Sequence, residues 1–489
     1  MLVVTVFSVV ERLLGFIYRI FLSRSLGAEL LGVYQVALSV VGLIMTITAS
    51  GIPITVSRIM TKHDAENQTQ KNFSTVTAGI VLSIIASLPV ALIIYLVPSV
   101  SGIAFYDERS FEVFKVILPG IVITSVYSVI RGYFWGKKSF LTYSIIELLE
   151  EIVMLIAGVI LINGAVGGEN GLIGAGKAVL ISYVFSFITA VLLYFLRGGK
   201  LKNPCGEFKP LISSATPITV MRTLTSLINT LIAVILPLRL VVSGFTQTEA
   251  MASFGELSGM SIPLIYIPST LIGSIALVLV PELSDNYYRH SRVTLKNNVE
   301  KAVKCSVFIS ALIIPVFIAM GKEIGVLVYD NLNAGKYVQN ASLIMLPMSV
   351  SLISTSMLNS LNLERKTLVY YLIGAFLLVL CIWFLPKYIG IYSLVIGLMI
   401  SYLLTSVLNL KLIKKTLEYP PKYKAFILLS VLLIIPTVLF CHLLKGIFIR
   451  FIPLFWCVLI CSVLSVIFIA TLYKVFNLFD IRELLKSKR

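Results

Sequence analysis

The chain has 489 residues, of which 58% are hydrophobic and only 13% are charged, and its mean hydropathy is +0.98. A soluble protein of this length needs far more polar surface, so the composition excludes a soluble globular fold. The net charge of +17 would suit nucleic acid, but the basic residues occupy short links between apolar segments, which argues against a nucleic-acid-binding surface.

Apolar segments long enough to cross the hydrocarbon core of a bilayer recur along the whole chain. Because backbone groups in lipid must be hydrogen-bonded within their own segment, each crossing is predicted to be a helix. The first segment lacks a basic leader and a cleavage site, so we expect a helix that is retained and not a signal peptide. The predicted crossings cover residues 2–22, 31–58, 74–97, 113–135, 145–163, 172–196, 211–240, 251–280, 302–321, 341–361, 368–385, 391–410, 424–444 and 451–473. We therefore predict an all-α integral membrane protein of about fourteen transmembrane helices.

The links divide these helices into two lobes of six and a final pair. The N-terminal lobe is predicted at residues 1–200, the C-terminal lobe at 201–415, and two extra helices with a basic cytoplasmic tail at 416–489. Each lobe has an even number of crossings, so both begin on the same side of the membrane. A duplication would then relate them by a pseudo-twofold axis along the membrane normal.

Most of the 40 Lys and Arg residues lie in every second link. The positive-inside rule places those links, and with them both termini, in the cytoplasm of a cell-membrane protein. The same residues can contact anionic headgroups, so the bilayer is a predicted partner and nucleic acid is not. The basic links are residues 58–71, 131–138, 197–209, 289–304, 365–366, 411–424 and 474–489.

The sequence contains little that would support catalysis. No two of the six cysteines have the spacing of a metal or redox motif, and there are only three histidines. We find no phosphate-binding loop, no dinucleotide fingerprint and no catalytic triad signature. We therefore expect no enzymatic reaction, no metal and no cofactor, and leave open whether H⁺ or Na⁺ serves as a coupling ion.

Charged residues inside the first predicted crossing break the apolar pattern. This segment contains Glu11, Arg12 and Arg19, and Arg24 lies at its outer end. Arg12 and Arg19 are seven residues apart and share one helix face. An ionisable group near the bilayer centre costs about 2.5–3.5 kcal/mol, so this cationic stripe is predicted to face the interior of the bundle.

Two further segments contain internal charges. Glu147, Glu150 and Glu151 share one face at the start of the fifth crossing, and Arg222 lies in the seventh. Packing ion pairs, or side chains that extend to the interface, would explain them structurally. The functional alternative is an aqueous cavity in which Arg12, Arg19, Arg24 and Arg222 contact an anionic headgroup. Glu147, Glu151 and Glu11 would then serve coupling or gating, and guanidinium groups suit phosphate because their donors form a rigid fork.

Several motifs occur in a characteristic order along the first 150 residues. They are Gly15-Phe16-Ile17-Tyr18-Arg19-Ile20, Ser23-Arg24-Ser25-Leu26-Gly27-Ala28-Glu29, Gly32-Val33-Tyr34-Gln35, Ser50-Gly51-Ile52-Pro53, Arg131-Gly132-Tyr133-Phe134 with Gly136, and Ile146-Glu147. Here the chain resembles the stage V sporulation protein B family. That family belongs to the polysaccharide-transporter branch of the superfamily that also holds lipid II flippases and multidrug and toxin extruders.

The resemblance implies two six-helix lobes around a central cavity with alternating access. It implies a polyprenyl-diphosphate-linked saccharide as cargo, such as lipid II, and a role in spore cortex or envelope peptidoglycan synthesis. Arg24 falls where the lipid II flippases carry a cavity arginine, whereas Tyr18 replaces another of their arginines. A third has no match near Thr46, and Leu148 follows Glu147 where the family commonly has Gln.

Our leading hypothesis is a flippase for a polyprenyl-diphosphate-linked glycan, with cell-wall synthesis enzymes as further partners. A cation-coupled multidrug antiporter is one alternative, although the first helix has more Arg than acidic residues. A membrane-embedded glycosyltransferase would need catalytic acids in a long external loop, and the external links are short. A sporulation scaffold without transport activity is a further alternative.

Overall fold

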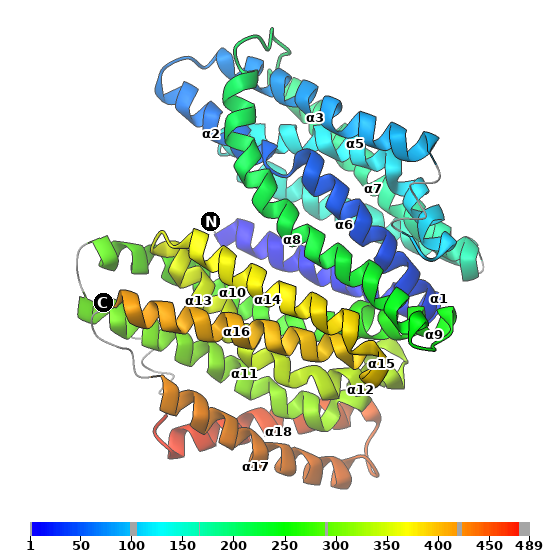
Figure 1. Ribbon diagram of the computed structural model, residues 1–489, viewed down its shortest axis with the longest axis vertical. Coiled ribbons are helices and arrows are strands. Elements are labelled where there is room, and N and C mark those ends of the chain that lie inside the picture. The colour runs from blue at the N-terminus through cyan, green and yellow to red at the C-terminus, as the bar shows by residue number, and fades with distance from the viewer. Residues whose placement is uncertain (1, 98–104, 166, 289–291, 418–422, 479–489) are drawn as a thin grey trace. The chain divides into compact units, whose positions relative to one another are not determined.

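The computed structural model describes residues 2–97, 105–165, 167–288, 292–417 and 423–478, and the regular structure in these ranges is helical (Figure 1). The chain forms two compact units, Met1–Gly255 and Glu256–Arg489. The helices of the first unit are α1 (Leu2–Ala49), α2 (Ile52–Ala65), α3 (Lys71–Leu96), α5 (Glu108–Gly136), α6 (Phe140–Gly164), α7 (Gly168–Leu196), α8 (Phe208–Val242) and α9 (Gln247–Phe254).

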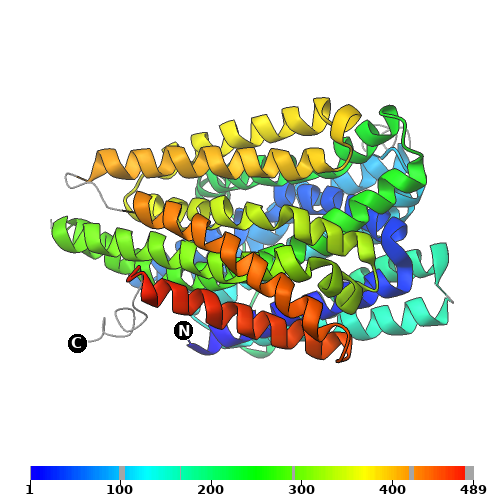
Figure 2. The ribbon, with the colours of Figure 1, turned by 90° about the horizontal axis from the view of Figure 1, so that it is seen from below.

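The second unit continues from a π-helical turn, η2 (Gly255–Ser261). Its helices are α10 (Ile262–Tyr288), α11 (Arg292–Tyr329), α12 (Leu332–Ala341), the 3₁₀ turn η3 (Ser342–Ile344), α13 (Met345–Ser360), α14 (Glu364–Phe384), α15 (Pro386–Ile389), α16 (Tyr392–Thr416), α17 (Lys424–Phe448) and α18 (Leu454–Val475). The final pair, α17 and α18, forms an antiparallel hairpin that packs on α11 (Figure 2). An ion pair fastens this hairpin, because Lys445 Nζ lies 2.6 Å from Glu323 Oε1 on α11.

Helix α1 contains two of the predicted crossings. It is broken at Gly27, whose φ of 78° and ψ of 176° are not helical. A residue with a Cβ atom would pay about 1–2 kcal/mol for a positive φ, so glycine is the residue that permits this kink. The second part of α1 and α2 then make up the predicted crossing at residues 31–58, and Pro53 occupies the first turn of α2.

The helix count agrees with the sequence. In the described part of the chain, 12 helices or joined helix runs are long and apolar enough to cross a membrane, the first being Phe7–Ala65. Because that run is bent at Gly27, it holds two crossings. Helix α6 carries three glutamates and is not among the 12, but its 25 residues extend about 38 Å, enough for a bilayer. The predicted fold class, an all-α membrane protein of about fourteen crossings, is confirmed.

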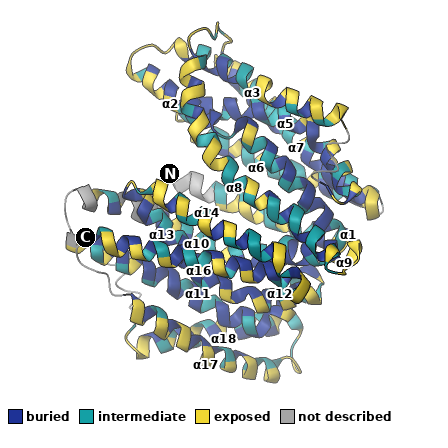
Figure 3. Ribbon diagram, in the orientation of Figure 1, coloured by how far each residue is buried: buried dark blue, intermediate teal, exposed yellow. Residues whose placement is uncertain are grey.

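Many residues along the helices are exposed (Figure 3), and large apolar side chains are among them. Ile85 and Leu92 on α3, and Leu428 and Leu439 on α17, are all exposed. Water would be a poor solvent for apolar faces of this extent, whereas hydrocarbon is a good one. The burial pattern therefore supports the membrane assignment independently of the hydropathy.

Two sequence predictions stay untested. The predicted lobe boundaries at residues 200 and 415 follow from the number of crossings, whereas the chain divides into its two compact units after Gly255. The predicted lobes therefore remain a prediction. The cytoplasmic location of the basic links is likewise a prediction. Arg289, Lys422 and the basic tail after residue 478 lie outside the described residues.

Candidate functional site

The first unit contains a partly open cavity of about 260 Å³ with both polar and apolar lining. Side chains from α5, α6, α7 and α8 surround it, together with the end of α1 and Ser50, which follows that helix. Four of its lining residues carry formal charges, and they are Arg131, Glu147, Glu150 and Arg222. The remaining lining residues are Met45, Thr46, Ala49, Ser50, Thr124, Ser125, Tyr127, Ser128 and Tyr183. The helices thus hold a site with both signs of charge inside an apolar protein.

Arg131 is the central basic group of this cavity. Its Nη1 atom lies 3.6 Å from Glu147 Oε1 and donates a hydrogen bond of 3.4 Å to the Tyr143 hydroxyl. The Tyr143 hydroxyl in turn donates to Glu147 Oε1. The Arg131 and Glu147 side chains are 26% and 23% exposed, so water screens their attraction only in part.

Aromatic rings hold the guanidinium group in place. Its carbon lies 5.2 Å from the centre of the Trp135 ring and 5.8 Å from that of Tyr143, both within the range of cation–π attraction. The two rings meet edge to face, with their centres 5.5 Å apart. Among the described residues, the buried Nε atom of Arg131 has no hydrogen-bond partner. Arg131 therefore keeps one donor for a ligand.

A close contact between two helices holds the part of α5 that carries Arg131. At the next residue, Gly132, a Cβ atom would lie 2.6 Å from the carbonyl oxygen of Pro53 on α2. Real Cβ atoms do not approach so closely, so only glycine lets α5 and α2 come together here. Earlier on α5, the Ser125 hydroxyl is 3.2 Å from that of Thr48 on α1. These contacts hold α5 against the first two helices.

Arg222 reaches the cavity from α8. Its Nη1 atom donates a hydrogen bond of 3.3 Å to the carbonyl oxygen of Ser50, just beyond the last turn of α1. Carbonyl groups at a helix C-terminus lack partners within the helix and carry a partial negative charge, which suits a cation. In the part of the chain that the structure describes, no carboxylate lies within ion-pair distance of Arg222.

The structure brings together some of the predicted site residues. Glu147 and Arg222 line the cavity. Glu11 is close enough to Glu147 and Arg131 to interact with them electrostatically. Glu151 instead points toward α1, where its Oε2 atom would lie 3.8 Å from a Cβ atom added at Gly15. The acidic group predicted for coupling or gating is thus clustered, although only Glu147 of its three members lines the cavity.

The predicted cationic stripe does not line this cavity. Arg12 and Arg24 are exposed, and Arg19 is half-buried within electrostatic range of Tyr34 on the other side of the Gly27 kink. A role for these three arginines in headgroup contact remains a prediction.

Arg131 is the main correction to the sequence analysis, which assigned it to a basic link. It lies within the membrane-spanning segment Glu108–Gly136, five residues before α5 ends, and its side chain points into the cavity. The available signal was its position inside the predicted crossing at 113–135, ahead of Tyr133 and Phe134, which are apolar and buried. Glu150, which also lines the cavity, belonged to the predicted acidic face but not to the predicted site.

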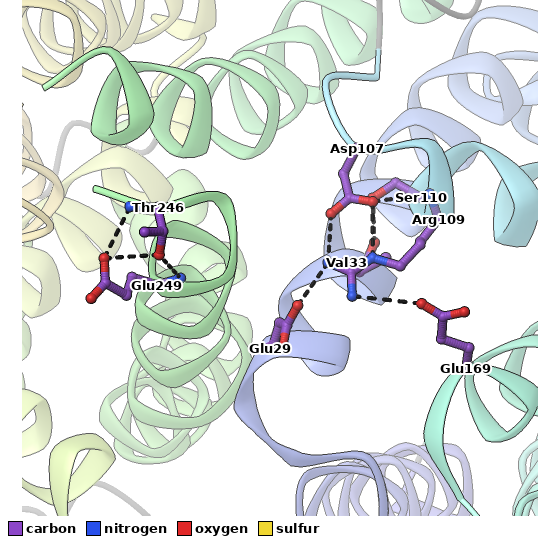
Figure 4. A network of polar contacts seen from close by, with 8 residues as sticks. All are labelled: Glu29, Val33, Asp107, Arg109, Ser110, Glu169, Thr246 and Glu249. Atoms are coloured by element: carbon purple, nitrogen blue, oxygen red, sulfur yellow. Dashed lines mark hydrogen bonds and ion pairs between the residues drawn. The ribbon is translucent and has the colours of Figure 1, made fainter. Parts of the chain in front are cut away.

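A second charged cluster lies at the N-terminal end of α5 (Figure 4). Arg109 contacts three carboxylates, with distances of 2.8 Å to Asp107 Oδ2, 2.7 Å to Glu29 Oε1 and 3.9 Å to Glu169 Oε1. Burial raises the pKa of Asp107, but hydrogen bonds from Arg109 and Gln247 and the Arg109 charge outweigh this effect, and the pKa lies below its ordinary value. Glu29 follows the kink and Glu169 begins α7, so Arg109 joins three helices.

Cofactor and metal sites need clustered ligands. Within the described ranges, no group of three His, Cys, Asp or Glu residues could hold a metal ion. The cavity lining offers arginines, carboxylates, hydroxyl groups and aromatic rings. Such a set of groups can bind an anion, which can take the place of a carboxylate as the partner of an arginine.

The chain is similar to known membrane proteins. Stage V sporulation protein B of Bacillus subtilis (strain 168) is 23% identical over 444 residues, covering 88% of this chain and 85% of that protein. The solved inward closed conformation of the lipid II flippase MurJ has a TM-score of 0.74 at 12% identity, covering 98% of this chain and 100% of that one. An inward-facing multidrug resistance MATE family transporter of the MOP superfamily has a TM-score of 0.68 at 14% identity, covering 82% and 92%.

These likenesses confirm the resemblance drawn from the sequence motifs, and the two solved structures establish the fold. The family model described as polysaccharide biosynthesis protein matches residues 1–287, more than half of the chain. The chain belongs to this polysaccharide biosynthesis protein family.

Proposed function

We propose that the protein is a flippase that moves a polyprenyl-diphosphate-linked glycan from the inner to the outer leaflet by alternating access. Lipid II, or a related cell-wall or polysaccharide precursor, is the cargo class. The names of two similar proteins, stage V sporulation protein B and lipid II flippase, support this assignment. No covalent bond is made or broken in this function.

The observation that carries the proposal is the cavity that holds Arg131 and Arg222 among apolar helices. A diphosphate-sugar headgroup cannot enter hydrocarbon unaided, because removing its charges from water costs many kcal/mol. Guanidinium groups replace part of the lost hydration with charge-assisted hydrogen bonds. Serine and threonine hydroxyls in the same lining offer partners to sugar hydroxyls.

The remaining sequence predictions belong to this proposal. Arg12, Arg19 and Arg24 contact the headgroup together with Arg222, and Glu147, Glu151 and Glu11 serve coupling or gating. The two predicted six-helix lobes move relative to each other, and both termini lie in the cytoplasm. An interior-negative potential then favours export of the anionic headgroup by about 2.3 kcal/mol per charge per 100 mV. The process served is spore cortex or envelope peptidoglycan synthesis in the cell membrane, alongside cell-wall synthesis enzymes.

Reconstitution tests the proposal directly. The purified chain is placed in vesicles with fluorescent lipid II, and the fraction of headgroups that a membrane-impermeant quencher reaches is followed over time. We expect the wild type to equilibrate the two leaflets and Arg222→Ala to slow this at least about 10-fold, because a charged contact to the moving headgroup is lost. Arg365→Ala, which alters an exposed arginine in a predicted basic link, is the matched control. Leaflet exchange no faster than in empty vesicles would refute the proposal for lipid II.

One observation favours a second candidate function. Glu147 and Glu150 face the same cavity, and the fold matches that of a multidrug resistance transporter. A cation-coupled antiporter would bind organic cations at such carboxylates. Efflux of ethidium from cells that express the chain, lost in Glu150→Gln, would support this candidate over the flippase.

A further inference from the structure

The contact between Arg131 and Glu147 has the features of an exchangeable ion pair. The 3.6 Å between Nη1 and Oε1 exceeds the usual length of a charge-assisted hydrogen bond, about 2.7–2.9 Å. The two residues come from different helices, α5 and α6, and α6 packs far more extensively on α7 and α1 than on α5. The pair can therefore separate without disrupting the main packing of α6.

Arg131 and Glu147 each have further interactions that remain when the pair separates. The Tyr143 hydroxyl donates to Glu147 from one turn earlier on the same helix, so this carboxylate keeps a hydrogen bond when Arg131 is released. The Trp135 ring, on the same helix as Arg131, holds the guanidinium group by its face. The buried Nε atom of Arg131, without a hydrogen-bond partner among the described residues, offers a ligand one donor that Glu147 does not use.

The second arginine of the cavity, Arg222, contacts a carbonyl oxygen where Arg131 contacts a carboxylate. Arg222 donates to the Ser50 carbonyl oxygen, a neutral acceptor that a ligand can replace. A diphosphate has more acceptor oxygens and more negative charge than one carboxylate, and it can contact two guanidinium groups at once. The two arginines of the 260 Å³ cavity therefore offer a diphosphate more cationic partners than Glu147 uses, since Glu147 pairs with Arg131.

We propose that Glu147 takes the place of the substrate in the empty protein: it pairs with Arg131, and the diphosphate of the lipid-linked substrate displaces it. This inference rests on the proposed flippase function. The exchange keeps the partly buried guanidinium group paired at every stage, because an uncompensated charge there would be costly. It also makes release possible, since Glu147 competes for Arg131 when the substrate leaves.

The proposal predicts a specific pattern of affinities. Geranyl diphosphate, a short prenyl diphosphate, is titrated into the full chain in detergent, and binding is measured by calorimetry. Glu147→Gln is expected to raise the affinity about 10-fold, within the range of couplings between sites in proteins. In the Arg131→Gln background the same change is expected to raise the affinity no more than Glu150→Gln does, because only the general loss of a negative charge remains and Glu147 has no Arg131 to pair with. Equal melting temperatures of the four proteins show that folding is intact.

Glu150→Gln is the matched control, because it removes one negative charge from the same cavity. The Arg131 charge acts on Glu150, but among the described residues the two form no ion pair, so the effect of Glu150→Gln on affinity should depend on Arg131 far less than that of Glu147→Gln. A gain in Glu147→Gln that persists undiminished in the Arg131→Gln background would overturn the exchange but leave the flippase proposal intact. Failure of the wild type and of Glu147→Gln to bind the diphosphate would overturn both.

Discussion

Arg109 gives the sharpest test of the physical reasoning. Its guanidinium group is 26% exposed and compensates Asp107, whose side chain is 2% exposed. Arg109→Ala would leave that carboxylate buried, with Gln247 and the first turn of α5 as its remaining partners. It would also separate Glu29 and Glu169 from their shared cation.

The expected cost follows from the burial. Removing one partner of a fully buried ion pair costs about 3–5 kcal/mol. Because water reaches about a quarter of the Arg109 side chain, we expect about 2–3 kcal/mol here. For a unit of this size, 1 kcal/mol corresponds to about 2–4 °C in melting temperature, so the variant should melt about 4–12 °C below the wild type.

The effect should depend on pH in a defined direction. The folded-state pKa of Asp107 lies below its ordinary value of about 3.9, so its stabilising contribution is present above that value. The contribution is lost as the pH falls through the folded-state pKa. Without Arg109, burial dominates, the pKa rises above the ordinary value, and the ionised carboxylate destabilises the fold at pH 7. The difference between variant and wild type should therefore be large at pH 7 and narrow below about pH 4.

The assay is thermal unfolding in detergent, followed by fluorescence-detected gel filtration after stepwise heating. Lys115→Ala is the matched control: it removes an exposed cation from the same helix, where Lys115 lies 4.7 Å from the Phe111 ring centre. Its cost should stay below about 1 kcal/mol. Equal melting temperatures for Arg109→Ala and this control at pH 7 would refute the reasoning.

Three further changes probe packing, ion pairing and capping. Gly132→Ala places a Cβ atom against the Pro53 carbonyl oxygen and should cost about 1–3 kcal/mol while slowing lipid exchange in vesicles, because it moves α5. Lys445→Met removes the ion pair between Lys445 on α17 and Glu323 on α11 and should cost about 2–3 kcal/mol of thermal stability. Thr246→Ala removes the capping box at the start of α9 (Figure 4) and should cost about 1 kcal/mol in the same melting assay.

Each of these variants has a matched control in the chain. Gly42→Ala on α1 adds a methyl group where the described residues leave open space. Lys387→Met removes an exposed lysine, and Thr61→Ala removes an exposed hydroxyl that bonds only within its own helix. A control that loses as much stability as its test variant would contradict the mechanism assigned to that variant.

The candidate site could be predicted only in part. Glu147 and Arg222 were found because a charge within an apolar segment is costly and must face protein or water. Arg131 was missed because a sequence count treats a basic residue near a segment end as an orientation signal. Whether such a residue points inward depends on the rotation of its helix about its own axis, which a count of basic residues does not consider. Arg12 and Arg19 both lie on the part of α1 before Gly27, and which side of that part faces the cavity depends on how the helix packs.

The sequence by itself determined the membrane class, the number of crossings and the family resemblance. These properties depend on segment length, hydropathy and local motif order, all of which are local quantities. Only the tertiary structure decided which charges meet: Arg131 with Glu147 and Tyr143, and Arg109 with three carboxylates from three parts of the chain. Such pairings depend on helix rotation, kinks and close approaches such as that of Gly132 to Pro53. A rotation of one residue along a helix turns a side chain by about 100°, enough to move it from cavity to lipid.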